Sequence, residues 1–301
     1  MTLTQEQREY FLEKGYIVLR DCFTKEDAAR MLENVWIRLG MNPNDQSTWT
    51  RERVNMPWHR RVKVKEFAPK VYDAICELLG GEERVDEDST DWGDSIIVNL
   101  GTDEYTGVEK WQEPRDLDGW HCDGDFFRHY LDSPEQALLL TPIFSDEIKP
   151  KGGGTMMAVD GLSMIAKHLA AHPEGVNPRD FDAQKKINEC KEFVEMTGKV
   201  GDCCLMHPFM LHSASRNSLR VPRFIINPKV SVKEPFRFDR DPKDLSLVEQ
   251  KTLTCLGVDR YEFKPTGSRD IILPARENIW REVRMEEMAR VEAHRQVVAA
   301  K

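Results

Sequence analysis

The 301 residues are 40% hydrophobic and 32% charged, which is the composition of a folded globular protein long enough to bury a substantial core. The formal net charge of −9 argues against nucleic acid as a partner, because binding phosphates needs a surplus of Lys and Arg on one face. No stretch approaches the roughly 18 apolar residues of a membrane span, and residues 1–14 lack the apolar core of a signal peptide, so we expect no membrane partner and a cytoplasmic location. Seven cysteines without a Cys-x-x-Cys pair indicate reduced thiols rather than a disulfide framework or a zinc site.

Helices dominate the first 91 residues, which we interpret as an N-terminal scaffold. The capping-box pair Thr4 and Gln7 begins the first predicted helix, and Gly15 ends it. The predicted elements are helices at residues 4–15, 24–40 and 69–79, a strand at 16–19, a loop rich in Trp and Arg at 42–61, and an acidic connector at 82–91. We interpret the loop as a solvated surface segment; the alternative is a lid that contacts an anionic substrate.

Beyond residue 91 the hydrophobic period changes from helical to strand-like. Short apolar runs, separated by Gly and Pro turns, occupy residues 95–100, 137–144, 155–159, 203–211 and 224–226. Such a set is typical of a β-sandwich or jelly roll, including the cupin type, whose interior can hold a metal. We therefore predict a mainly β core (α+β) over residues 92–232, with flanking helices and a polar helical insert at 163–188.

The C-terminal extension, residues 233–301, carries charged loops and then a predicted helix at 277–300. An apolar stripe on this helix is formed by Ile279, Val283, Met288 and Val291. Such a stripe usually packs against the rest of the chain, although a terminal helix can also pair two copies in a homodimer. Because neither an internal repeat nor a low-complexity segment divides the chain, we predict a single domain over residues 1–301.

A candidate metal site begins with the run Trp120-His121-Cys122-Asp123-Gly124-Asp125. Side chains of a strand alternate between its faces, so His121 and Asp123 would point the same way and could bind one ion. His207 or His212 offers a third ligand, and two histidines with one carboxylate form the facial triad that holds non-haem Fe(II). These two histidines are five apart, so only one of them could face the metal from a regular strand. The alternative for His121 is a hydrogen-bonded histidine of the core or of a strand edge.

A second His-x-acid match, His172-Pro173-Glu174, shows that the pattern alone is not specific. It falls at a predicted helix end followed by a Pro/Gly loop, with no strand to align the two side chains. We therefore interpret His172 as a solvated histidine rather than a metal ligand.

Taken together, these residues resemble the phytanoyl-CoA dioxygenase (PhyH-like) family of Fe(II)/2-oxoglutarate-dependent oxygenases. Four motifs occur in the family's order: Phe11-x3-Gly15-Tyr16-x-Val18, Trp120-His121-x-Asp123, Gly201-Asp202 and His212-x4-Asn217-x4-Pro222-Arg223. The resemblance implies a double-stranded β-helix, or jelly roll, that binds the catalytic iron through His121, Asp123 and His212. It also implies that Arg223 binds the distal carboxylate of 2-oxoglutarate, and a planar guanidinium suits a bidentate carboxylate.

The spacing to Asn217 and Arg223 favours His212 over His207 as the ligand. We prefer Arg223 to Arg220 as the 2-oxoglutarate-binding arginine because Arg223 opens the predicted strand at 224–226 and matches the family position, whereas Arg220 lies in the turn before it. His207 is then interpreted as a packed or hydrogen-bonded histidine near the site. Two segments depart from the family pattern: residues 159–162 are Val-Asp-Gly-Leu in place of Pro-Gly-Ser-His, and residues 213–215 are Ser-Ala-Ser in place of Gly-Ser. Further candidate residues for binding 2-oxoglutarate are Ser213, Ser215, Thr155 and Asn99.

Candidate residues on the substrate side are Trp120, Phe127 and Arg128, and Arg128 could meet an anionic group. The alternative is a loop anchored by aromatic side chains. Because related halogenases lack the carboxylate ligand, Asp123 implies hydroxylation, desaturation or oxidative rearrangement.

We predict an Fe(II)/2-oxoglutarate-dependent dioxygenase, with Fe(II), 2-oxoglutarate and O2 as cofactors. It oxidises a small organic metabolite and releases succinate and CO2. Two alternatives from other classes are a cupin-type metalloenzyme that does not use 2-oxoglutarate and a non-catalytic jelly-roll binding module.

Overall fold

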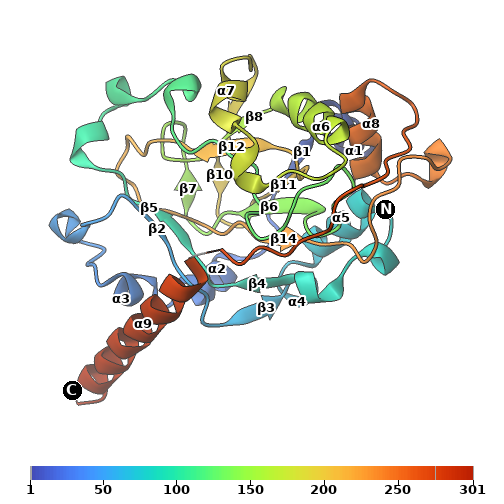
Figure 1. Cartoon of the computed structure of the whole chain (residues 1–301). Coiled ribbons are helices and arrows are strands. Elements are labelled where there is room, and N and C mark those ends of the chain that lie inside the picture. The colour runs from blue at the N-terminus through green and yellow to red at the C-terminus, as the bar shows by residue number, and fades with distance from the viewer. Residues whose placement is uncertain (1, 275, 301) are drawn as a thin grey trace.

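The computed structural model describes residues 2–274 and 276–300, and it consists of antiparallel sheets with helices packed around them (Figure 1). The largest sheet has the strand order β1 (Tyr16–Leu19), β11 (Cys203–Met206), β6 (Leu138–Pro142) and β14 (Lys229–Val230). Two three-stranded sheets have the orders β12 (Leu211–Ala214), β8 (Thr155–Ala158), β9 (Phe193–Glu195) and β13 (Arg223–Ile225), β5 (Ile97–Asn99), β2 (Arg53–Asn55). Two smaller ladders pair β10 (Gly198–Lys199) with β7 (Glu147–Ile148) and β3 (Arg61–Lys63) with β4 (Asp91–Gly93).

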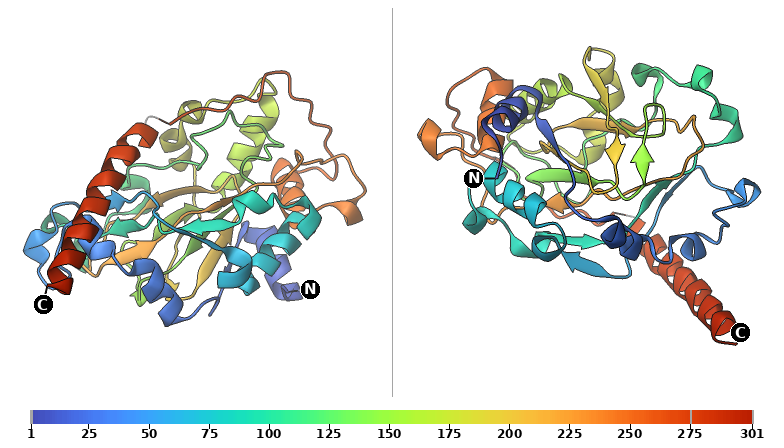
Figure 2. Two further views of the ribbon diagram at one scale, coloured as in Figure 1. Left: turned by 90° about the horizontal axis from the view of Figure 1, so that it is seen from below. Right: turned by 180° about the vertical axis from the view of Figure 1, so that it is seen from behind.

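Helices surround these sheets on several sides (Figures 1 and 2). They are α1 (Gln5–Lys14), α2 (Lys25–Leu32), α3 (Val35–Leu39), α4 (Val64–Phe67), α5 (Pro69–Leu79), α6 (Gly161–Ala171), α7 (Ala183–Ile187), α8 (Leu247–Leu256) and α9 (Arg276–Ala299). Short 3-10 turns occupy Gln46–Thr48, Glu82–Arg84, Glu87–Ser89, Asp103–Tyr105, Val108–Lys110, Pro114–Asp116, Pro178–Asp180 and Pro242–Asp244. Helices α1, α5 and α6 each contact α8, whereas α9 contacts α3 and extends away from the sheets (Figures 1 and 2).

Local signals set the ends of the first helices where the sequence predicts them. The Thr4 side chain accepts a hydrogen bond from the backbone N–H of Gln7, and Gly15 ends α1 at a φ of 76°. Pro69 occupies the first turn of α5, where its missing N–H costs no hydrogen bond, and Gly80 ends that helix in the left-handed region. Both predicted helices are confirmed.

The core lies between the sheets and the helices. Every residue of β6, β8 and β11 is buried, as expected for continuous apolar runs covered on both faces. Fully burying one such leucine or methionine contributes about 1.5–3 kcal/mol. The same cluster of buried side chains extends from Leu3 to Cys255, so α8 of the C-terminal extension packs into the core that α1 also joins. The predicted combination of a sheet core with flanking helices is confirmed.

The helix predicted over residues 24–40 is wrong in its middle, because the structure has two helices there, α2 and α3. The break falls at Glu33 and Asn34, and Asn34 adopts φ −114°, ψ 15°. The Asn side chain competes with the backbone for hydrogen bonds, which makes it a weak residue inside a helix.

Two further predictions of local structure are wrong in detail. The predicted loop at residues 42–61 contains β2, because Arg53-Val54-Asn55 has too few apolar residues to show a strand period and is ordered by pairing with β5. The run at residues 203–211 is two strands, β11 and β12, joined by a turn in which the N–H of Met210 donates to the carbonyl of His207.

The C-terminal helix α9 lies within a residue of its predicted ends, but its apolar stripe is not its buried face. Ile279 is 60% exposed and Met288 is 57% exposed, so the prediction that these two side chains pack on the chain is wrong. Glu287 is the buried residue of α9 instead. In the part of the chain that the structure describes, we find no helix both long and apolar enough to span a bilayer.

Candidate metal centre

A cavity of about 600 Å³ is lined by residues from many parts of the chain that are distant in sequence. Strands β2, β5 and β13 form one wall, β8 and β12 form another, residues 119–125 contribute His121 and Asp123, and α9 contributes Arg276 and Trp280. A cavity of this size is typical of small-molecule sites.

His121, Asp123 and His212 converge on one point of this cavity. The Nε2 of His121 lies 3.2 Å from Oδ1 of Asp123, and the Nε2 of His212 lies 3.6 Å from Oδ2. One ligand atom from each residue falls within 4.8 Å of the others. The donor set of two imidazoles and one carboxylate is the one that non-haem Fe(II) takes with coordination positions left over, so these residues fit that metal.

The backbone brings the ligands together through a bridge rather than through the predicted strand. His121 and His212 form an isolated antiparallel bridge, with N–H to carbonyl distances of 3.1 and 3.0 Å in the two directions. Asp123 lies in the bend that follows. The expectation that strand alternation aligns His121 with Asp123 is therefore wrong, and the bridge to β12 replaces it.

The hydrogen bonds of both imidazoles leave Nε2 available as a ligand atom. The Nδ1 of His121 lies 2.7 Å from the carbonyl of Gly119, and the Nδ1 of His212 lies 3.0 Å from the carbonyl of Met210. Because a carbonyl only accepts, each Nδ1 carries the proton and each Nε2 presents its lone pair. Asn227 donates through Nδ2 to Oδ2 of Asp123 at 3.0 Å, which orients the carboxylate.

The Asp123 carboxyl lies between the imidazoles of His121 and His212, and both affect its pKa. Burial opposes ionisation of Asp123, but His212 and His121 hold the pKa of its carboxyl well below the usual range. Burial also opposes a proton on His121, but hydrogen bonding to Asp123 outweighs it and raises the pKa of His121. A divalent cation needs the same lone pairs, so we expect metal and protons to compete for this site.

Gly124 allows the chain to turn sharply after Asp123. Its φ is +109°, and a Cβ there would lie 2.5 Å from the Phe127 ring and 2.9 Å from the His129 ring. The Nε2 of His129 lies 2.7 Å from the carbonyl of Gly124, which fixes the turn from the other side. Any residue larger than glycine would displace the loop that carries Asp123.

Arg223 lies at the buried end of the cavity and is 2% exposed. Its Nε donates to the carbonyl of Gly153 at 2.8 Å, and its Nη1 donates to the carbonyl of Ile97 at 3.3 Å. Among the described residues it has no carboxylate within ion-pair distance. Burial, and secondly the charge of Arg53, lower the pKa of Arg223 to about 9, so a bound anion would favour its charged form.

The rival arginine and the rival histidine lie outside the cavity lining. Arg220 donates to the carbonyl of Gly101 and forms an ion pair with Asp103, each at 3.3 Å. His207 lies in the turn before β12 and is fully buried away from Asp123. A turn separates these two histidines, so they do not lie on one regular strand as predicted.

The other candidate residues for 2-oxoglutarate divide into two groups. Thr155 and Ser213 line the cavity, and the Ser213 hydroxyl donates to the carbonyl of Asp118 at 2.6 Å. Asn99 and Ser215 are buried behind it: the Asn99 amide donates to the Ser215 carbonyl at 3.0 Å, and the Ser215 hydroxyl donates to Glu195 at 2.9 Å.

Trp120, Phe127 and Arg128 lie outside the residues that line the cavity. The Trp120 indole N–H donates to the carbonyl of Pro114 at 3.0 Å. The Phe127 ring stacks on His129, and Arg128 forms an ion pair with Asp270 at 3.1 Å. These contacts anchor the chain on both sides of His121 and Asp123.

The cavity lining includes polar and aromatic residues that were not among the predicted site residues, and these include Arg53, Asn227, Arg276 and Trp280. Arg53 belongs to the Trp- and Arg-rich segment, so a signal for it was present. Arg276 forms an ion pair with Asp125 across the mouth of the cavity, but nothing in the sequence connects two residues 151 positions apart.

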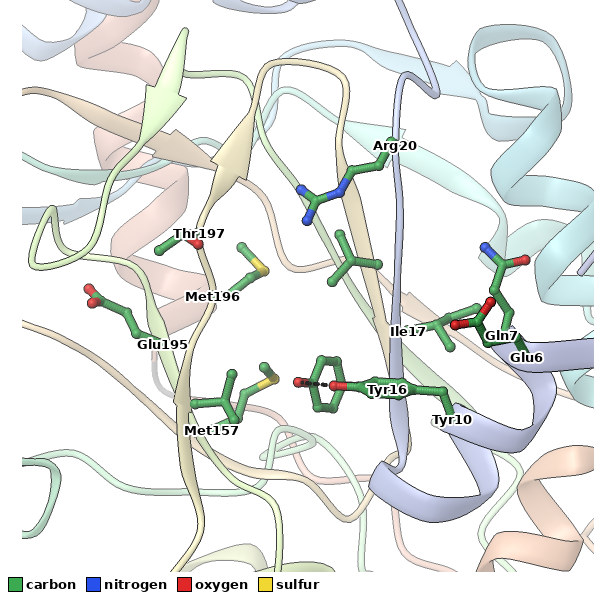
Figure 3. Close-up of a pocket in the computed structure, with 12 residues that line it drawn as sticks. Glu6, Gln7, Tyr10, Tyr16, Ile17, Arg20, Met157, Glu195, Met196 and Thr197 are labelled. Atoms are coloured by element: carbon green, nitrogen blue, oxygen red, sulfur yellow. Dashed lines mark hydrogen bonds between the residues drawn. The ribbon is translucent and has the colours of Figure 1, made fainter. Parts of the chain in front are cut away.

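A second cavity, of about 470 Å³, lies between α1, β1 and the pair β8–β9 (Figure 3). The hydroxyls of Tyr10 and Tyr16 are hydrogen-bonded at 2.7 Å and face Met157 and Met196. Among its described lining residues we find no histidine or cysteine, so this cavity lacks the ligand set of the first.

Comparison with known proteins gives a match to the model of phytanoyl-CoA dioxygenase (PhyH) over residues 11–224, most of the chain. The chain belongs to the phytanoyl-CoA dioxygenase family. The predicted membership is thereby confirmed, and so is the prediction of a dioxygenase with Fe(II), 2-oxoglutarate and O2 as cofactors.

This family member is also similar to individual proteins. A probable alpha-ketoglutarate-dependent hypophosphite dioxygenase of Stutzerimonas stutzeri is 27% identical over 229 residues, which cover 73% of this chain and 75% of that protein. EctD from S. alaskensis, solved with 2-oxoglutarate and 5-hydroxyectoine, is 15% identical, with 76% of each chain covered and a TM-score of 0.41. HygX from Streptomyces hygroscopicus, solved with nickel and 2-oxoglutarate, is 11% identical, with 77% and 88% covered and a TM-score of 0.40.

Proposed function

We propose that this dioxygenase oxidises a small organic metabolite and releases succinate and CO2, with iron held by His121, Asp123 and His212. The observation that carries the proposal is that one cavity presents both this ligand set and the buried guanidinium of Arg223. We also propose that the sheets around the cavity form a double-stranded β-helix. A cytoplasmic location and a homodimer formed through α9 stay predictions.

Each residue has a distinct task in this proposal. Bound Fe(II) supplies the redox chemistry that couples reduction of O2 to oxidation of 2-oxoglutarate and the substrate. Asp123, oriented by Asn227, keeps a negative charge between the two imidazoles, and the carbonyls of Gly119 and Met210 hold both imidazoles in the ligating tautomer.

Arg223 binds the distal carboxylate of 2-oxoglutarate. Two of its nitrogens are held by the carbonyls of Gly153 and Ile97, which fix the plane of the guanidinium and leave its remaining N–H groups for the carboxylate. Because Arg223 is buried, its interaction with an anion is little screened by water. Thr155 and Ser213 supply hydroxyls to the same cavity.

Anaerobic titration tests the proposal. Addition of Fe(II) and then 2-oxoglutarate should produce the visible metal-to-ligand charge-transfer band. Arg223→Gln should raise the Kd for 2-oxoglutarate roughly 10- to 100-fold, because it removes a charge-assisted contact worth about 1.5–3 kcal/mol. Arg220→Gln is the matched control and should change this Kd less than threefold, since Arg220 pairs with Asp103 instead.

Absence of the band in folded, Fe(II)-loaded protein would refute the use of 2-oxoglutarate. Retained Fe(II) binding would then favour a metalloenzyme that does not need this cosubstrate. Loss of both would favour a binding module.

A further inference from the structure

A second arginine shares the wall of the cavity with Arg223. Arg53 of β2 and Arg223 of β13 are both paired in register with Asn99 of β5. Residues directly opposite each other in antiparallel strands point to the same face of the sheet, so both arginines project from the face that lines the cavity.

The contacts of Arg53 leave its ligand-binding edge without a partner. Its Nε and Nη2 are buried and have no hydrogen-bond partner among the described residues. The neighbouring carboxylates are too far for hydrogen bonds: Oδ1 of Asp118 lies 3.8 Å from Nη1, and Oε1 of Glu52 lies 3.9 Å from Nη2. Glu52 is already bound by Arg216 at 3.0 Å.

The unpaired Nε–Nη2 edge has a specific chemical preference. These two N–H groups form the planar fork that binds a carboxylate or phosphate oxygen pair side by side. Leaving both donors buried and unsatisfied is costly, and a bound oxyanion would satisfy both of them.

The charges of the cavity favour an oxyanion in addition to 2-oxoglutarate. Asp125 is neutralised by Arg276, and Asp123 belongs to the metal. The wall therefore carries two cations, and the charge of Arg53 lowers the pKa of Arg223. The ion pairs of Arg53 with Glu52 and Asp118 are long, at 3.9 and 3.8 Å, and leave its Nε and Nη2 without a hydrogen bond. The backbones of β2 and β13 are separated by two strand spacings, roughly 9.6 Å, because β5 lies between them.

Depth distinguishes the tasks of the two arginines. Arg223 is 2% exposed, whereas the Arg53 side chain is 28% exposed and therefore lies nearer the solvent. A molecule that binds after 2-oxoglutarate would therefore lie nearer to Arg53 than to Arg223.

We propose that Arg53 binds an oxyanion group of the substrate, so that the enzyme selects a small anionic molecule. This inference rests on the proposed function, in which Arg223 takes 2-oxoglutarate. Arg53 is a specificity-determining residue that holds the anionic end while the metal faces the rest of the molecule.

Calorimetric titration of the anaerobic Fe(II)·2-oxoglutarate complex tests the proposal with three probes: acetate, methylphosphonate and methanesulfonate. At least one of them should bind the wild-type protein. Arg53→Gln should weaken that binding at least tenfold and Arg53→Lys by less, because lysine keeps the charge but lacks the fork. In both variants the Kd for 2-oxoglutarate should change less than threefold.

Arg51→Gln is the matched control, because Arg51 lies two residues away and is exposed to solvent. It should leave both affinities unchanged.

If no probe binds a complex that shows the charge-transfer band, the inference is overturned while the proposed function stands. If Arg53→Gln raises the Kd for 2-oxoglutarate as much as Arg223→Gln does, Arg53 belongs to the cosubstrate site and the inference is likewise overturned. Failure of the proposed function is a separate result, in which the band itself is missing.

Discussion

Two histidines five positions apart, His207 and His212, show how hydrogen bonding decides what an imidazole can do. His212 gives its Nδ1 proton to a carbonyl and keeps Nε2 for a ligand. At His207 the arrangement is reversed: Nδ1 accepts from the N–H of Phe209 at 3.2 Å, and Nε2 contacts the hydroxyl of Thr252 at 3.0 Å. Burial lowers the pKa of His207 to about 3, so this residue is neutral and structural.

Alanine substitutions should separate these two histidines. His212→Ala should weaken Fe(II) binding at least 100-fold, because the facial triad loses a ligand. His207→Ala should leave the Kd for Fe(II) within threefold but lower the free energy of unfolding by about 1–3 kcal/mol, because it leaves buried polar groups unpaired. Anaerobic calorimetry and denaturant unfolding measure the two quantities. The opposite pattern would assign the ligand role to His207.

At the scale of elements, α9 is held to α3 and to the loop that carries His59 by charge rather than by its apolar stripe. Glu287 accepts from the Nε of Arg38 at 2.8 Å and contacts the Nε2 of His59 at 2.7 Å. Arg38 also forms an ion pair with Asp94 at 3.1 Å, and Arg38, Asp94 and Glu287 are all buried. This network places the first turns of α9, with Arg276 and Trp280, beside the cavity.

Removing the charge of Glu287 should therefore loosen the helix. Glu287→Gln leaves a buried arginine partly uncompensated, which costs about 3 kcal/mol, and amide exchange across residues 276–299 should accelerate. Glu286→Gln, one residue earlier, removes only an exposed pair with Arg290 and should change stability by less than about 0.5 kcal/mol. Hydrogen-exchange mass spectrometry compares the protection of α9 in the two variants. Equal protection of α9 in both variants would show that the network does not anchor it.

For the whole molecule, the continuous core indicates that the N-terminal scaffold, the sheets and α8 depend on one another. The buried apolar residues of α1, α5, α6 and α8 belong to the cluster that also fills the sheets. We propose that residues 1–301 form a single domain, and the bridge between His121 and His212 ties the metal site to it.

Thermal unfolding should then be one cooperative transition, with equal calorimetric and van't Hoff enthalpies. Saturating Fe(II), added anaerobically at 100 times its Kd, should stabilise the folded state by about 2.7 kcal/mol and move the whole transition upward. Scanning calorimetry with and without metal measures this. Two separate transitions, or a metal shift confined to one of them, would contradict a single domain.

Local signals in the sequence determined much of the scaffold and named the candidate ligands. Capping residues and the proline at the start of α5 act within a few residues, so no tertiary information is needed to place those helices. The candidate ligands and Arg223 could be predicted from the sequence because they fall in motifs that occur in a fixed order along the chain.

Only the tertiary structure decided how these residues meet and what else joins them. Strand β2, which carries Arg53, exists because it pairs with β5. Glu287 is buried because Arg38, 249 residues earlier, compensates its charge. The bridge that aligns His121 with His212 spans 91 positions. Contacts over such separations depend on how the whole chain folds, so neither residue type nor spacing reveals them.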